Sequence, residues 1–216
     1  ACGDDDGSSG PADREMGVDG GDADMDASAD AGPMDPVTLT PYAGACTPVA
    51  PFAGVPALEE CGHWSAARFA PRTAAGEVLA LRYVLNDDTD SGFSDPGLAH
   101  RIRFFSATGD APPARFSGAL TLDVPNAPAP PGMDRAVELT LDEPFLVPAG
   151  EALYVAFEMV CSPGRTYPAL GVDLCGSAPG TYWWSQASGE PYDWLTHESF
   201  GFEPAAPLVS VTFRER

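Results

Sequence analysis

The stretch EVLALRYVL, residues 77–85, carries the clearest strand signal in the chain. Successive side chains of a β-strand point to opposite faces, so residues two apart in the sequence share a face. One face of this stretch carries Leu79, Leu81, Tyr83 and Leu85. Apolar residues repeating at this period predict a strand with one side in a core.

Further short apolar runs follow, separated by Gly, Pro, Asn and Asp. They lie at residues 100–106, 120–124, 137–141, 153–159 and 208–213, and in the last run Val209, Val211 and Phe213 should face inward. The 23 Pro and 23 Gly disfavour long helices. Strands at this spacing predict an all-β fold, an antiparallel β-sandwich with a jelly-roll-like arrangement.

Residues 1–40 differ from the rest of the chain in composition. They hold ten Asp, one Glu and one Arg, a net charge of −10, and they contain no aromatic residue. Such a segment cannot bury enough apolar surface to offset the entropy lost on ordering. We therefore expect a disordered acidic tether at 1–40 and the β-sandwich domain at 41–216.

The charge of the chain limits its partners. The formal net charge is −21, and all eleven basic residues are arginine. An acidic surface of this kind is repelled by nucleic acid and by anionic lipid. We expect no nucleic-acid partner, and membrane contact only through a lipid anchor.

The chain begins Ala1-Cys2-Gly3-Asp4 and continues with Asp, Ser and Gly. This start resembles a bacterial lipoprotein just after its signal peptide, in which the cysteine carries the lipid. The resemblance implies lipidation at Cys2, and Gly3 in place of Asp implies an outer-membrane or cell-surface location. The alternative is an ordinary free cysteine near the terminus.

A second resemblance covers about residues 78–202. Its motifs are ALRYVL, the turn Gly97–His100, DRAVELTL and the ending YWW…PYDW…SFG. These are similar to an uncharacterised β-sandwich module of myxobacterial-type surface lipoproteins. The resemblance implies a fold and a compartment, but no activity.

Four cysteines remain besides Cys2. In an exported domain an even number predicts disulfides, here two bridges with three alternative connectivities. The short gaps favour the pairs Cys46–Cys61 and Cys161–Cys175. A zinc site would need closely spaced cysteine or histidine partners, and that spacing is absent.

The densest acidic cluster outside the tail follows the strand at 77–85. Its carboxylates belong to Asp87, Asp88, Asp90 and Asp95. Oxygen ligands closely spaced on a loop are what Ca²⁺ requires, so a structural calcium ion is one interpretation. The other is a turn rich in Asn, Asp, Ser and Gly, which these residues favour for local reasons. We expect no other cofactor.

Catalytic motifs are absent from the sequence. Ser199 lies in His-Glu-Ser-Phe-Gly, which lacks the first glycine of a nucleophile elbow, and neither a phosphate loop nor a dinucleotide fingerprint is present. A pair of carboxylates for glycoside hydrolysis stays open as an alternative. We expect a protein that is not an enzyme.

The segment TYWWSQASGEPYDWLTHESFGF, residues 181–202, holds three of the four tryptophans. We expect a hairpin that turns at 185–191, with most rings in the core and one face of Trp183 exposed. The candidate ligand-binding residues are Trp183, Trp184, Tyr192 and Trp194. Two functions follow: a structural or interaction protein displayed at the surface, with a surface protein or glycan as partner, or a carbohydrate-binding module with an aromatic platform, assisted by calcium.

Overall fold

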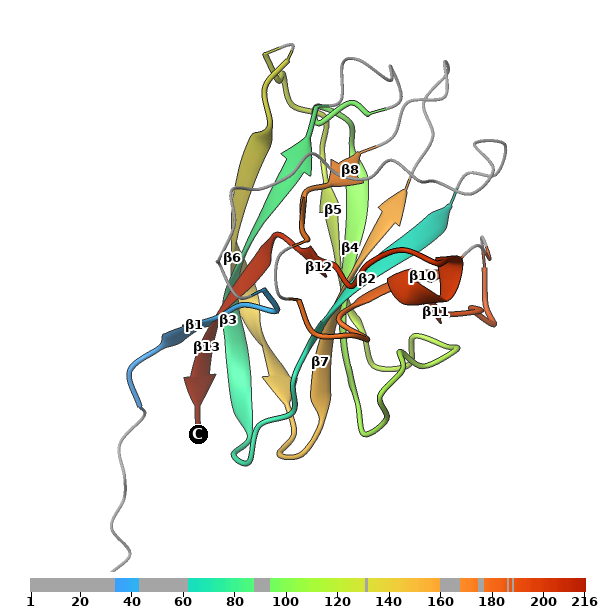
Figure 1. Ribbon diagram of the computed structural model, residues 1–216. Coiled ribbons are helices and arrows are strands. Elements are labelled where there is room, and N and C mark those ends of the chain that lie inside the picture. The colour runs from blue at the N-terminus through green and yellow to red at the C-terminus, as the bar shows by residue number, and fades with distance from the viewer. Residues whose placement is uncertain are drawn as a thin grey trace, which may run out of the picture. The chain divides into compact units, whose positions relative to one another are not determined.

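The strand expected at 77–85 is β3 (Gly76–Asn86), which lies inside the first of two packed sheets (Figure 1). The protein is described by a computed structural model, which covers residues 34–42, 62–87, 94–130, 132–159, 168–174, 177–185, 187 and 189–216. Within these residues no helix combines the length and the apolar character needed to span a bilayer.

All strand pairs in the described residues are antiparallel. The first sheet has the order β1 (Val37–Leu39), β13 (Val209–Glu215), β3 and β6 (Arg135–Val147), with β8 (Ala169–Leu170) paired to the end of β3. The second sheet has the order β11 (Leu195–Thr196), β10 (Tyr182–Ser185), β2 (His63–Phe69), β7 (Ala152–Met159), β4 (His100–Ala107) and β5 (Leu120–Val124).

The strand order is that of a jelly roll. When β8 to β12 are set aside, eight strands remain, and they pair first with last, second with seventh, third with sixth and fourth with fifth. These pairs are β1 with β13, β2 with β7, β3 with β6, and β4 with β5. One long hairpin wrapped around a core produces this order, which confirms the predicted β-sandwich and its jelly-roll arrangement.

The core lies between the inner faces of the two sheets. Its largest fully buried side chains include Tyr83, Phe104 and Phe213, packed with the inward residues of β2 and β7. The inward placement expected for Val209, Val211 and Phe213 is confirmed. The prediction for Leu79 is wrong, because a bulge between Val78 and Ala80 shifts the alternation and places Val78 in the core instead.

The segment between β7 and β13 is an insertion into the jelly roll. Its strand β10 extends the second sheet beyond β2, and β11 pairs with β10, so the hairpin expected in 181–202 is present. The residues that pair with Trp183 and Trp184 are Thr196 and Leu195. A 3₁₀ helix, η1 (His197–Phe200), follows, and β9 (Val172–Asp173) pairs with β12 (Ala206–Pro207).

The domain begins earlier than the boundary at residue 41. β1 lies within 1–40, yet its Val37 and Leu39 pair with Phe213 and Val211 of the last strand. Three residues are too few to show a strand period in the sequence, and β1 is stabilised by this pairing with a distant strand. The remainder of the expected tether, up to residue 33, lies outside the described residues.

Candidate functional site

The candidate ligand-binding tryptophans point to opposite faces of the second sheet, and both faces are covered. Trp183 is 9% exposed and Trp184 is 5% exposed. The prediction that one face of Trp183 stays open is therefore wrong. Because successive side chains of a strand alternate, the two rings lie on opposite faces of the sheet, as expected. The alternation does not predict which segments cover the outer face.

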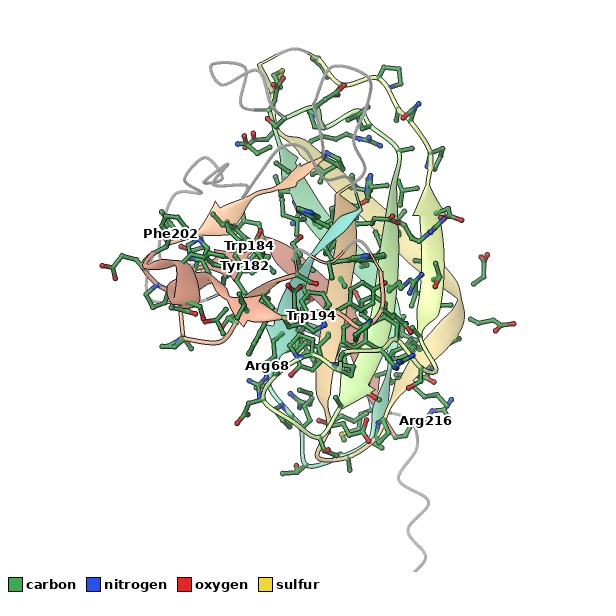
Figure 2. All side chains as sticks on the ribbon, turned by 90° about the vertical axis from the view of Figure 1, so that its right-hand side faces the viewer. Arg68, Tyr182, Trp184, Trp194, Phe202 and Arg216 are labelled. Carbon is green, nitrogen blue, oxygen red and sulfur yellow. The ribbon has the colours of Figure 1, made fainter. Side chains whose placement is uncertain are left out.

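Trp184 packs within the insertion itself. Its ring lies 5.5 Å from Tyr182, 5.3 Å from His197 and 5.3 Å from Phe200. Figure 2 shows Trp184 together with Tyr182 and Phe202, whereas Trp194 lies apart from them. Burial raises the pKa of Tyr182 to about 12, as expected for a phenol held away from water.

Trp183 packs on the outer face of the second sheet, meaning the face directed away from the first sheet. It belongs to a cluster with Trp64, Phe116 and Tyr192. The segments around Phe116 and Tyr192 lie over this face and hold each other through backbone contacts. Tyr192 N donates to Ala114 O at 2.8 Å, and Phe116 N donates to the Glu190 carboxylate at 2.9 Å.

Trp194 is half-buried and anchored. Its indole nitrogen donates to the carbonyl of Pro113 at 2.9 Å, and its ring lies 5.9 Å from that of Phe116. The guanidinium of Arg103 lies beneath this cluster, 5.0 Å from the ring of Trp64. The aromatic residues of 181–202 thus build core on both faces of the sheet, and they do not present a flat platform to solvent.

The described carboxylates of the expected calcium site each accept a hydrogen bond from a backbone N–H group. Asp87 accepts a hydrogen bond from Gly132 N at 2.6 Å, and Asp95 accepts one from Gly97 N at 2.8 Å. Asp88 and Asp90 lie outside the described residues. In the described part of the chain, no three His, Cys, Asp or Glu side chains are grouped for a metal ion. The Asp95 contact, two residues along the chain, is that of a local turn, whereas Asp87 joins this segment to Gly132, 45 residues further on.

All five cysteines lie outside the described residues: Cys2, Cys46, Cys61, Cys161 and Cys175. The lipidation site and both disulfides stay predictions.

All three histidines are described, and each is buried. His100 Nδ1 lies 2.9 Å from the carbonyl of Leu98, and a carbonyl only accepts, so Nδ1 carries the proton. The Tyr83 hydroxyl then donates to His100 Nε2 at 2.5 Å. Burial lowers the pKa of His100 and raises that of Tyr83, which keeps both rings neutral.

His197 is also engaged inside the protein. Its Nδ1 lies 2.8 Å from the carbonyl of Glu203, and its ring stacks on Tyr182. Ser199 is exposed, and its hydroxyl pairs with that of Thr196 at 2.9 Å. Ser199 is thus hydrogen-bonded to Thr196 and His197 to Glu203, an arrangement that is not a nucleophile and base pair.

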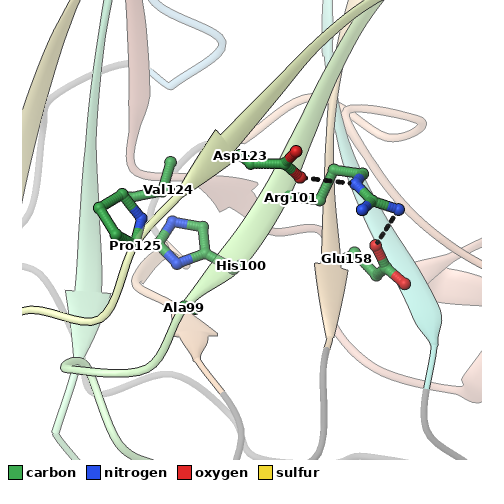
Figure 3. A pocket seen from close by; sticks show the side chains of 7 residues that line it. All are labelled: Ala99, His100, Arg101, Asp123, Val124, Pro125 and Glu158. Atoms are coloured by element: carbon green, nitrogen blue, oxygen red, sulfur yellow. Dashed lines mark hydrogen bonds and ion pairs between the residues drawn. The ribbon is translucent and has the colours of Figure 1, made fainter.

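An open hollow of about 620 Å³ lies at the end of β4, β5 and β7 (Figure 3). Three charged side chains form a row across these strands on the outer face. Arg101 Nε donates to Asp123 Oδ1 at 2.8 Å, and Arg101 Nη1 lies 3.5 Å from Glu158 Oε2. The hydrogen bond to Asp123 raises the pKa of Arg101, so the guanidinium stays charged. Figure 3 shows His100 on the opposite side of β4 from Arg101.

A second hollow, of about 510 Å³, lies on the outer face of the first sheet. It crosses β1, β13, β3 and β6 and is polar. Its hydroxyl groups belong to Thr38, Thr140, Ser210 and Thr212, and the ion pair Arg82–Glu138 borders it.

Neither hollow was identified from the sequence. The alternation of 100–106 already directs Arg101 away from the core, but the partners of Arg101 lie on strands 22 and 57 residues further along the chain. Likewise Thr38 and Thr212 look like ordinary surface residues until β1 and β13 are known to pair.

The comparisons with known proteins bear on the fold. No family model matches this chain, and no curated protein matches it. The chain is similar to the crystal structure of the cysteine protease and lectin-like domains of Cwp84, a surface layer associated protein of Clostridium difficile. The TM-score is 0.51 at 9% sequence identity, over 71% of this chain and 32% of that chain. The chain therefore spans about a third of the matched protein, and the similarity shows the β fold alone.

Proposed function

We propose that this chain is a non-enzymatic, lipid-anchored protein of the cell surface or outer membrane, with a structural or interaction role. The burial of all three histidines carries the non-enzymatic part of this proposal. A histidine that acts as general base must reach the reacting group in the substrate. Here His100 and His197 each use Nδ1 on a backbone carbonyl inside the protein.

The surface location rests on Cys2 and the acidic segment that follows it. The fold similarity to a surface layer associated protein agrees with this location. The net charge of −21 does not favour binding of the chain to a membrane surface. A lipid on Cys2 would hold the chain at the membrane despite this charge.

Metabolic labelling tests the anchor. The chain, preceded by a lipoprotein signal peptide, is expressed in a Gram-negative host that is fed an alkyne analogue of palmitate. We expect label and membrane fractionation for the wild type and for Ser8→Ala, and loss of both for Cys2→Ser. A wild-type chain that is unlabelled and soluble would contradict the proposal.

Carbohydrate binding is the second candidate function. Two hollows lined by hydrogen-bonding side chains favour it, and the similar structure includes a domain described as lectin-like. The aromatic platform does not support it, because Trp183 and Trp184 are buried. The test is an oligosaccharide microarray probed with the Cys2→Ser chain, with and without a calcium chelator. Because Asp87 and Asp95 each accept a hydrogen bond from a backbone N–H group, we expect binding that the chelator leaves unchanged.

A further inference from the structure

The hollow of the first sheet carries a row of hydroxyl groups across its strands. The register places Thr38 opposite Thr212, Thr212 opposite Ala80, and Ala80 opposite Thr140. Ser210 lies in the neighbouring row, opposite Arg82. We call Thr38, Thr140, Ser210 and Thr212 the hydroxyl face.

The side chains of the hydroxyl face point outward because their neighbours point inward. Val211 and Phe213 flank Thr212 along β13, and both belong to the core. Within the described residues, none of the four hydroxyl groups is hydrogen-bonded to another protein group. Thr38 and Thr140 are exposed and Thr212 is half-buried, so these three hydroxyls can donate and accept towards a ligand, whereas Ser210 is largely buried.

One ion pair lines the hollow in the row of Ser210 and another lies beyond the hollow, but the row of Thr38, Thr212 and Thr140 carries no charged side chain. Arg82 Nε lies 3.2 Å from Glu138 Oε1 in the row next to Thr140. Beyond the bulges, Arg214 Nε donates to the buried carboxylate of Glu77 at 2.8 Å. A ligand on the hydroxyl face therefore meets neutral donors and acceptors rather than a net charge.

Irregularities in the pairing of the strands that line the hollow account for its shape. Register shifts occur between Val78 and Ala80 in β3 and between Thr212 and Phe213 in β13, directly beside the hydroxyl row. Bulges bend a strand and increase its local twist, and they often occur next to functional sites. The side chains themselves stand on four paired strands, which is a rigid support.

The hollow of the second sheet is less suited to a neutral ligand. Its donors and acceptors already satisfy one another, since Arg101 is paired with both Asp123 and Glu158. A ligand there must compete with two ion pairs at Arg101, whereas the row of Thr38, Thr212 and Thr140 holds no ion pair to displace.

We propose that the hydroxyl face binds a segment of a neutral polysaccharide, lying across β1, β13, β3 and β6. This rests on the carbohydrate-binding function proposed above and assigns its site and ligand class. Neighbouring strands lie about 4.8 Å apart, close to the length that one hexopyranose unit adds to an extended glycan. Successive sugar units of the glycan can therefore contact successive strands of the sheet. The net charge of −21 disfavours an anionic glycan.

The experiment compares matched substitutions on the two sheets in the full chain carrying Cys2→Ser. Thr140→Val with Thr212→Val removes two hydroxyls of the hydroxyl face at nearly constant shape. Thr121→Val makes the same change on the exposed face of β5 in the second sheet, and Arg101→Ala opens the charged row. Thermal melts establish that each variant is folded.

The probes are cellohexaose and mannohexaose as neutral hexasaccharides and hexagalacturonate as an anionic one, measured by titration calorimetry. We expect binding of at least one neutral hexasaccharide, and about a tenfold or greater increase in its Kd for the double threonine variant. Thr121→Val and Arg101→Ala should bind like the parent chain. A parent chain that binds only hexagalacturonate would overturn the ligand class.

Two further outcomes separate the site from the function. If a neutral hexasaccharide binds and Arg101→Ala abolishes binding while the double threonine variant retains it, the site assignment is wrong and carbohydrate binding stands. If the folded parent chain binds no hexasaccharide, the carbohydrate function fails, and the site assignment fails with it.

Discussion

Replacing Trp184 by alanine tests whether the aromatic residues of 181–202 form core. Trp184 is 5% exposed and contacts the rings of Tyr182, His197 and Phe200. Removing a buried tryptophan loses its transfer free energy and leaves a cavity, which lowers the free energy of unfolding by about 3–5 kcal/mol. For a domain of this size each kcal/mol lowers the Tm by about 2–4 °C, so the expected decrease is about 6–20 °C.

Differential scanning calorimetry at neutral pH measures this decrease. Leu195→Ala is the matched control, because Leu195 pairs with Trp184 across β10 and β11 but is 44% exposed. Its substitution should change the free energy of unfolding by only about 0.5 kcal/mol. A Trp184→Ala variant that melts like the control would refute the assignment of Trp184 to the core and reopen the platform interpretation.

Three further predictions concern the cysteines, a buried histidine and the acidic segment. Peptide mapping without reduction should find the bridges Cys46–Cys61 and Cys161–Cys175, each worth about 3 kcal/mol by the chain-entropy estimate; free thiols or crossed pairs would contradict this. Because burial lowers the pKa of His100, the unfolded chain takes up a proton more readily, and the free energy of unfolding should fall as the pH drops below about 6.5. His100→Gln should flatten that dependence in urea titrations between pH 7 and pH 5, and an unchanged slope would assign it to other groups. Limited proteolysis should trim the acidic segment ahead of β1 and leave a cooperatively melting domain, whereas hydrogen-exchange protection of that segment would count against a simple tether.

The strands that could be predicted share one pattern, in which large apolar residues on the core face alternate with mostly polar or small residues on the other face. β4, β5 and β13 show this period of two because one side meets the core and the other carries mostly polar side chains. β7 is buried on both faces, yet its core face holds Leu153, Val155 and Phe157 while the buried residues of its other face are mostly alanine. β2 was missed because it lacks this pattern. Its burial is nearly continuous from His63 to Phe69, because the core covers one face and the aromatic cluster around Trp64 covers the other. In β2 both faces mix large and small side chains, so no regular alternation is left to detect.

The amino-acid sequence by itself determined the β class, the inward faces of most strands and the hairpin in 181–202. These features depend on residues close together in the chain, where side-chain period and turn chemistry act locally. Only the tertiary structure decided that both Trp183 and Trp184 are buried, and that Thr38 and Thr140 lie in one row with Thr212. The burial of these rings and the alignment of these threonines depend on which distant segments of the chain pack together. The side-chain period of a single strand does not determine which strands lie beside it.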